Sequence, residues 1–155
     1  MMTNLSSDVI KALQGRTLAT AESCTGGGIG AALTAVSGSS AVYKGGIISY
    51  TNEIKENLLG VPAAMLAQYG AVSEPVAQAM AEGARKALQT DIAVSVTGLA
   101  GPGGDEYGNP VGTVFVGYAD RTKSYAKAFY FAGNRGEVRN QAIQAVLQII
   151  LQENI

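Results

Sequence analysis

Residues 16–28 read R-T-L-A-T-A-E-S-C-T-G-G-G, and this stretch decides the fold. Residues 16–23 favour a strand, the glycines that follow favour a tight turn, and residues 27–36 favour a helix. The order of strand, glycine turn and helix is typical of α/β domains. It also sets two candidate nucleophiles, Ser23 and Cys24, side by side where the strand ends.

Strand and helix patterns alternate along the rest of the chain. We expect further strands at residues 42–51, 92–97, 111–119 and 124–131. We expect further helices at residues 6–14, 52–60, 62–69, 73–88 and 137–152. The last two strands are predicted to form a hairpin, and Gly45-Gly46 to kink the strand that contains them. The pattern therefore predicts a single α/β domain over residues 1–155, with a mixed β-sheet flanked by helices.

The composition limits the classes of function. Of the 155 residues 47% are hydrophobic and 15% are charged, which indicates a globular chain. The net charge is −1, and the 11 basic residues are spread along the chain, so no basic stripe indicates nucleic-acid binding. No apolar run is long enough for a membrane span, and the first residues do not resemble a signal peptide. We therefore expect a cytoplasmic protein with neither nucleic acid nor membrane as partner, and its size is compatible with a homodimer.

The chain contains no histidine and one cysteine. This composition excludes Ser-His-Asp and Cys-His arrangements within the chain, histidine-ligated metals and cysteine-cluster zinc sites. We expect neither a metal nor a cofactor. An acid–base catalyst must then be Lys, Tyr, Asp, Glu, an amino terminus or water.

The glycine turn has a functional and a structural interpretation. Backbone N–H groups at the start of the predicted helix lack partners within it, so Thr25, Gly26 and Gly27 can bind an anion or stabilise an oxyanion. Alternatively, the glycines only allow a tight turn and close packing of the helix on the sheet. Neither of the common glycine-rich nucleotide fingerprints is present.

Ser23 and Cys24 need a base, and S-Y-T-N-E-I-K at residues 49–55 offers two. Tyr50 ends the second predicted strand, and Lys55 lies about one turn into the next helix. A lysine in a dry site can act as general base, and Ser–Lys pairs replace histidine in some hydrolases. The alternatives are a solvated Lys55, a packed Tyr50 and a Cys24 that fills the core.

Two further segments carry candidate ligand-binding residues. Thr97 and the glycine-rich loop after it, including Gly98 and Gly101, follow an apolar strand, where α/β proteins bind ligands. Arg135 and Arg139 lie one turn apart near the start of the last helix, and either can bind a phosphate or carboxylate.

These segments resemble, in order, the CinA C-terminal domain family, also known as nicotinamide-nucleotide amidases. The matching pieces are T-A-E-S-C-T-G-G, G-S-S-A-V-Y-K-G-G-I-I-S-Y-T-N-E-I-K-E-N-L-L-G-V, G-A-V-S-E-P-V-A, S-V-T-G-L-A-G-P-G-G and P-V-G-T-V. The chain departs from the expected pattern at Gly28, where a larger residue is expected, and at Asn109, where a basic residue is common.

The resemblance implies a bacterial hydrolase of NAD metabolism that cleaves the carboxamide of nicotinamide mononucleotide to nicotinate mononucleotide and ammonia. It implies Ser23 as nucleophile, Lys55 as base and Tyr50 as the neighbour that orients or shares the proton. It also implies that Thr97 and the Gly98 loop contact the substrate and that Arg135 or Arg139 binds its phosphate. Two alternatives stay open: a non-catalytic nucleotide-binding module, and a partner of a separate protein resembling the N-terminal domain that many members carry.

Overall fold

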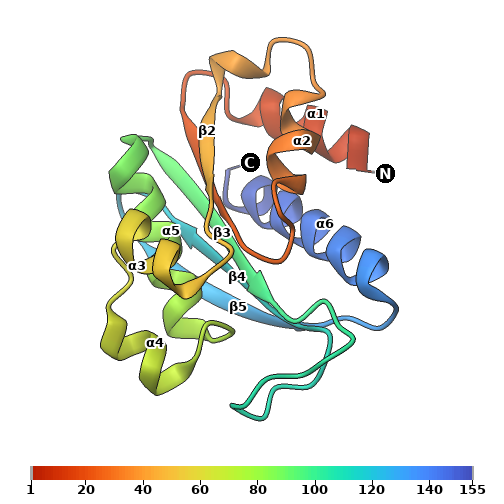
Figure 1. Ribbon diagram of the computed structural model, residues 1–155. Helices are drawn as coiled ribbons and strands as arrows, with labels where there is room; N and C mark the ends of the chain where they lie inside the picture. Colours follow the sequence, from red (N-terminus) through yellow and green to blue (C-terminus); the bar gives the residue numbers. More distant parts are fainter. Residues whose placement is uncertain (1, 155) are drawn as a thin grey trace.

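A computed structural model describes residues 2–154 of the chain. Its centre is a five-stranded sheet in the order β2-β1-β3-β4-β5. β1 (Leu18–Glu22) pairs in parallel with β2 (Tyr43–Ile48) and with β3 (Ile92–Gly98). β4 (Thr113–Ala119) and β5 (Ser124–Tyr130) continue the sheet as antiparallel strands (Figure 1). The predicted mixed sheet and its terminal hairpin are confirmed.

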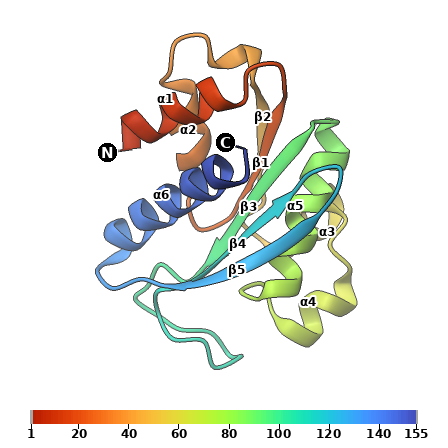
Figure 2. The ribbon, with the colours of Figure 1, turned by 180° about the vertical axis from the view of Figure 1, so that it is seen from behind.

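Helices cover both faces of the sheet (Figure 2). One layer holds α1 (Met2–Ala12), α2 (Gly28–Thr34) and α6 (Arg135–Glu153). The other holds α3 (Asn52–Leu59), α4 (Ala63–Tyr69) and α5 (Glu74–Leu88). Side chains alternate between the two faces of a strand, so Leu18 packs in the first layer's core and Ala19 in the second.

Most elements lie where the sequence predicts them, and the differences are local. The first helix begins at Met2, four residues before its predicted start, and α6 begins at Arg135. β2 ends at Ile48, three residues early, because the chain turns away from β1 toward α3. A short 3-10 helix, Ser39–Ala41, was not predicted. The irregularity predicted at Gly45-Gly46 lies one residue earlier, because the β1–β2 register skips Lys44 between Tyr43 and Gly45.

Two of the helix ends differ in how they are formed. Gly60 ends α3 with a left-handed backbone (φ 70°), which glycine adopts without strain. Ser73 occupies the position before α5, but its hydroxyl donates to the Gly70 carbonyl at 2.8 Å and does not cap the helix. Ser73 therefore fixes the turn between α4 and α5.

Glycine is required where α3 approaches α5. A Cβ on Gly83 of α5 would overlap the carbonyl oxygen of Leu59, the last residue of α3. The absence of a side chain at Gly83 therefore lets the end of α3 pack closely against α5. No helix within residues 2–154 is long and apolar enough to cross a membrane.

Candidate active site

Ser23 and Lys55 meet where β1 and β2 end. Ser23 follows β1, and its N–H donates to the Val96 carbonyl of β3 at 3.0 Å, which fixes it against the sheet. Lys55 lies in the first turns of α3. Thr51 caps the start of this helix, because its hydroxyl accepts a hydrogen bond from the N–H of Ile54. The Lys55 Nζ donates to Ser23 Oγ at 3.1 Å. The two residues thus form a hydrogen-bonded pair.

Lys55 is almost completely buried, with 1% of its surface exposed. Its Nζ also donates to the Ser49 carbonyl at 2.7 Å and to the Tyr50 carbonyl at 3.4 Å. No acidic side chain forms a salt bridge with it among the described residues. Burial disfavours the charged amine and lowers the pKa of Lys55 to about 8. The interpretation of Lys55 as a solvated helix residue is therefore wrong.

Cys24 follows Ser23 in the chain, but its thiol is buried and has no adjacent base among its hydrogen-bond partners in the described part of the chain. It is 5% exposed and belongs to the core between the sheet and α6, although it also touches the pocket described below. Burial raises the pKa of its thiol to about 11. A thiol in this state is a poor nucleophile at neutral pH.

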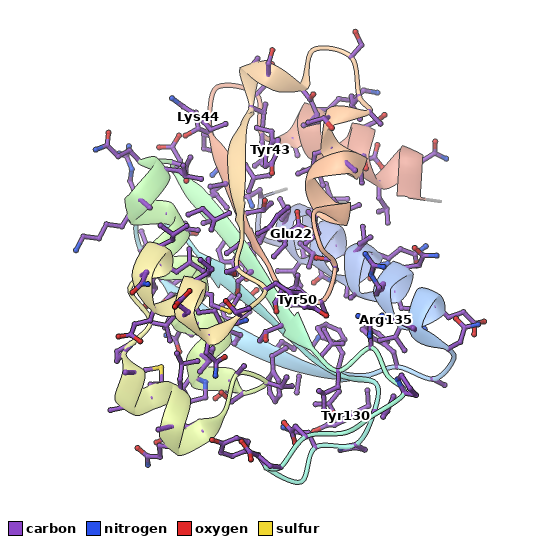
Figure 3. All side chains as sticks on the ribbon, viewed as in Figure 1. Glu22, Tyr43, Lys44, Tyr50, Tyr130 and Arg135 are labelled. Atoms are coloured by element: carbon purple, nitrogen blue, oxygen red, sulfur yellow. The ribbon has the colours of Figure 1, made fainter. Side chains whose placement is uncertain are left out.

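Tyr50 and Arg135 lie across the mouth of the site (Figure 3). The Tyr50 side chain is 60% exposed, and its hydroxyl accepts a hydrogen bond from Arg135 Nη2 at 3.2 Å. Arg135 Nη1 donates to the Gly101 carbonyl at 2.7 Å. The structure therefore links Tyr50 to Lys55 through its backbone carbonyl, whereas its hydroxyl pairs with arginine.

A pocket of about 310 Å³ opens above the Ser23–Lys55 pair. Its wall includes Tyr50, Thr97, Gly98, Gly101 and Arg135. The Thr97 hydroxyl donates to the Ala71 carbonyl at 2.9 Å, so what it has left for a ligand is an acceptor lone pair.

Thr25, Gly26 and Gly27 are not part of the wall of this pocket, and their expected role in binding an anion stays a prediction. The Glu22 carboxylate accepts hydrogen bonds from the N–H groups of Gly27, Ile29 and Gly30. The Thr25 hydroxyl donates to the same carboxylate at 2.6 Å. The start of α2 already holds an anion, supplied by the chain itself.

Four N–H groups of the turn after Ser23 differ in whether they have an acceptor. Two are bonded within the turn, because the N–H of Gly26 donates to the Ser23 carbonyl and that of Gly28 to the Thr25 carbonyl. No described residue accepts a hydrogen bond from the N–H of Cys24 or Thr25. The donors available to an oxyanion thus come directly after Ser23, and the glycines shape the turn.

The two arginines of α6 have different surroundings. Arg135 is exposed at the pocket mouth, whereas Arg139 lies outside the pocket wall and is partly buried. Arg139 Nη2 donates to the Thr25 carbonyl at 3.0 Å, and its buried Nε has no partner among the described residues. Arg139 therefore supports the turn that follows Ser23.

The two departures from the family pattern have local explanations. A Cβ on Gly28 would come within 2.6 Å of Ile143 Cδ1, the flexible end of an α6 side chain. Asn109 Nδ2 donates to the Val72 carbonyl at 3.0 Å and to Asp105 Oδ2 at 2.8 Å. Asn109 thus ties the loop after β3 to the segment between α4 and α5.

Sequence reasoning did not single out Glu22 or Ser49. Glu22 stands just ahead of a glycine turn and a helix start, where a carboxylate is favoured, and that position is a usable signal. Ser49 acts through its carbonyl, for which the sequence carries no signal. Among residues 2–154 no three His, Cys, Asp or Glu side chains form a cluster that would hold a metal ion.

The fold and the site define an α/β domain with a mixed parallel and antiparallel sheet and a buried Ser–Lys pair where its parallel strands end. The model of the CinA C-terminal domain matches residues 2–154, and the chain belongs to this family.

Similar proteins support the assignment at two levels. A CinA-like protein of Parasynechococcus marenigrum is 50% identical over 145 residues, which are 92% of this chain and 35% of that protein. The chain thus spans about a third of the length of this relative. The crystal structure of competence damage-inducible protein A from Klebsiella pneumoniae has a TM-score of 0.95 at 38% identity, covering 98% of this chain and 96% of that one. The competence/damage inducible protein CihA from Agrobacterium tumefaciens has a TM-score of 0.95 at 37% identity, covering 99% and 96%.

Proposed function

We propose that the chain hydrolyses the carboxamide of nicotinamide mononucleotide to nicotinate mononucleotide and ammonia. The observation that carries this proposal is the buried Lys55 Nζ, 3.1 Å from Ser23 Oγ. Amide hydrolysis without histidine needs a nucleophile with an adjacent base, and this pair supplies both. The pairing of amidase chemistry with this particular substrate rests on the family resemblance.

The hydrogen bonds of Lys55 suit a neutral amine that acts as base. A neutral amine has two N–H donors and one lone pair. In the charged form the three N–H groups donate to Ser23 Oγ and to the carbonyls of Ser49 and Tyr50. When the amine loses the proton that faces Ser23, the two carbonyls hold the remaining N–H groups and the lone pair faces the Ser23 hydroxyl. With a pKa of about 8, roughly a tenth of Lys55 is neutral at pH 7. A histidine is therefore not needed to activate Ser23.

The reaction proceeds through an ester on Ser23. Lys55 takes the hydroxyl proton while Ser23 Oγ attacks the carboxamide carbon, which gives a tetrahedral intermediate. Lys55 returns this proton to the amide nitrogen, the C–N bond breaks and ammonia leaves. Water then attacks the ester while Lys55 accepts its proton. Lys55 passes this proton to Ser23 Oγ as the bond to the acyl carbon breaks, which releases the acid and restores the hydroxyl.

The developing negative charge needs donors close to Ser23. The N–H groups of Cys24 and Thr25 have no acceptor among the described residues and directly follow the nucleophile. Donors at this position stabilise oxyanions in other acyl-transfer enzymes and contribute about 3–4 kcal/mol each. We assign this role to them in place of the glycines.

Arg135 is the phosphate-binding arginine in this proposal. It lies at the pocket mouth beside Tyr50, and its guanidinium contacts neutral acceptors, the Gly101 carbonyl and the Tyr50 hydroxyl. A phosphate is a stronger acceptor than either of these and can form two parallel hydrogen bonds with a guanidinium. Arg139 is committed to the Thr25 carbonyl.

The test is product analysis with the purified chain. We expect equal amounts of ammonia and nicotinate mononucleotide from nicotinamide mononucleotide, and a much higher KM for nicotinamide riboside, which lacks the phosphate. Saturable binding of nicotinamide mononucleotide without ammonia release would contradict the enzyme and favour the nucleotide-binding module. Absence of both binding and turnover would favour a partner of a separate N-terminal-type protein.

A further inference from the structure

We propose that Glu22 is a positioning residue that fixes the positions of the nucleophile Ser23 and the base Lys55 relative to each other. The inference rests on the proposed function, because it assigns a role in the same reaction. Glu22 is the last residue of β1 and directly precedes Ser23. Its side chain is directed to the start of α2 (Figure 3).

The Glu22 carboxylate organises the whole turn after Ser23. Oε1 accepts from Thr25 Oγ1 at 2.6 Å, from the N–H of Gly27 at 3.1 Å and from that of Ile29 at 2.9 Å. Oε2 accepts from the N–H of Gly30 at 2.9 Å. The four bonds join the end of β1 to the first turn of α2, so residues 23–27 are closed into a compact loop.

The Glu22 carboxylate is buried without a salt bridge among the described residues. Glu22 is 2% exposed, and no lysine or arginine within residues 2–154 forms a salt bridge with it. The charge is stabilised by N–H dipoles and a hydroxyl, which are fixed in direction. Those bonds therefore constrain the turn more tightly than a mobile surface ion pair would.

The backbone of Glu22 reaches the base as well. Its carbonyl accepts the N–H of Ser49 at 2.7 Å and the Ser49 hydroxyl at 3.4 Å. The Ser49 carbonyl in turn accepts Lys55 Nζ at 2.7 Å. One residue thus fixes the turn that carries Ser23 through its side chain, and the carbonyl that orients Lys55 through its main chain.

The carboxylate also selects which N–H groups remain available. By accepting from Gly27, Ile29 and Gly30 it occupies the start of α2, and the N–H groups of Cys24 and Thr25 stay without an acceptor among the described residues. Loss of the carboxylate frees the donors of α2 and loosens the turn. We therefore expect its loss to lower kcat and to leave substrate binding at Arg135, and with it KM, unchanged.

A second groove gives access to Glu22 from behind the site. This groove of about 270 Å³ lies between α2 and β2, and its wall includes Glu22, Gly27, Gly30, Tyr43 and Gly46. Because Glu22 forms part of the groove wall, truncation of its side chain would extend the groove into the space that the carboxylate occupies. A small carboxylic acid can therefore replace the Glu22 side chain if it is truncated.

The experiment measures kcat and KM for nicotinamide mononucleotide in Glu22→Gln and Glu22→Ala, with and without sodium acetate. We expect Glu22→Gln to lower kcat about 100-fold with KM within about twofold, because the amide group presents N–H to backbone donors. Acetate should raise kcat of Glu22→Ala at least tenfold, whereas sodium chloride at the same ionic strength should not. Glu22→Asp provides a folded variant if the other two fail to fold, and it should keep a lowered kcat.

The control is Asp91→Asn, since Asp91 also accepts a backbone N–H, that of Thr17, at the opposite end of the sheet. It should lower stability and leave kcat unchanged. A kcat of wild-type size in Glu22→Gln or Glu22→Asp, or no acetate response in a folded Glu22→Ala, would overturn the proposal.

Labelling of Ser23 by a fluorophosphonate separates this inference from the choice of substrate. Slower labelling in Glu22→Gln than in wild type supports positioning even if nicotinamide mononucleotide is not hydrolysed. Equal labelling rates overturn positioning even if the wild type is an amidase. Absence of labelling and of hydrolysis in the wild type overturns both.

Discussion

Lys55 Nζ lies 3.1 Å from Ser23 Oγ although 32 positions separate the two residues in the chain. The parallel pairing of β1 with β2 brings them together, because the ends of both strands fall at the same edge of the sheet. Ser23 follows β1 directly, and Lys55 enters from α3 once the chain has turned after β2. The sheet topology thus assembles the pair.

The pH dependence of turnover should follow the Lys55 amine. The base form is neutral, so kcat/KM should rise with pH through a midpoint of about 8 and level off above it. A pH–rate profile between pH 6 and 10 checks this. Lys55→Arg keeps a charge that cannot be lost, and it should be inactive across the range. A flat wild-type profile would exclude Lys55 as the base.

The buried amine should cost the fold stability. Because burial lowers the folded-state pKa of Lys55 below its unfolded value, the protein bears this penalty in full below pH 8. Lys55→Met should therefore be inactive yet more stable by about 1–3 kcal/mol at pH 7. The stability difference between Lys55→Met and wild type should shrink as pH rises from about 8 toward 10.5. In this range Lys55 is neutral in the folded protein but still protonated in the unfolded chain, so the stability of the wild type rises with pH. Urea unfolding at pH 7 and pH 10 measures both differences, and a variant less stable than wild type at pH 7 would contradict the prediction.

Arg135 and Arg139 should separate in kinetics. Arg135→Gln should raise KM for nicotinamide mononucleotide about 10- to 100-fold, as expected for a lost charge-assisted bond, with little effect on nicotinamide riboside. Arg139→Gln removes the support of the Thr25 carbonyl, so it should lower kcat for both compounds. Equal losses on both compounds in Arg135→Gln would remove the phosphate assignment.

Replacement of two helix glycines by alanine should change the stability of the protein in opposite directions. Gly83→Ala drives a Cβ into the Leu59 carbonyl oxygen and should destabilise the protein by about 2–4 kcal/mol, because backbone must move. Gly136→Ala places its Cβ 3.6 Å from Asn134 Oδ1, an ordinary contact, and should stabilise by up to about 1 kcal/mol. Thermal unfolding compares them, and similar shifts would show that α3 can move away from α5.

The sequence predicts the sheet and the pair better than it predicts the turn between them. Apolar periodicity and glycine positions locate each strand to within a few residues, because these signals are local. Residue types and the absence of histidine make Ser23 and Lys55 candidates, and the family resemblance implies their roles. The occupation of the α2 start by Glu22 and the pairing of Tyr50 with Arg135 depend on side-chain contacts between distant segments. Local patterns carry no information on such contacts, so the sequence alone does not decide between the functional and the structural interpretation of the glycine turn.

The central claim is that Ser23 is the nucleophile and Cys24 is not. Ammonia release from nicotinamide mononucleotide at pH 8.5 by wild type, Ser23→Ala and Cys24→Ala tests it most directly. The account predicts a loss on the order of 1,000-fold or more in Ser23→Ala and turnover within a few-fold of wild type in Cys24→Ala. Retained turnover in folded Ser23→Ala, or its loss in folded Cys24→Ala, would contradict the account.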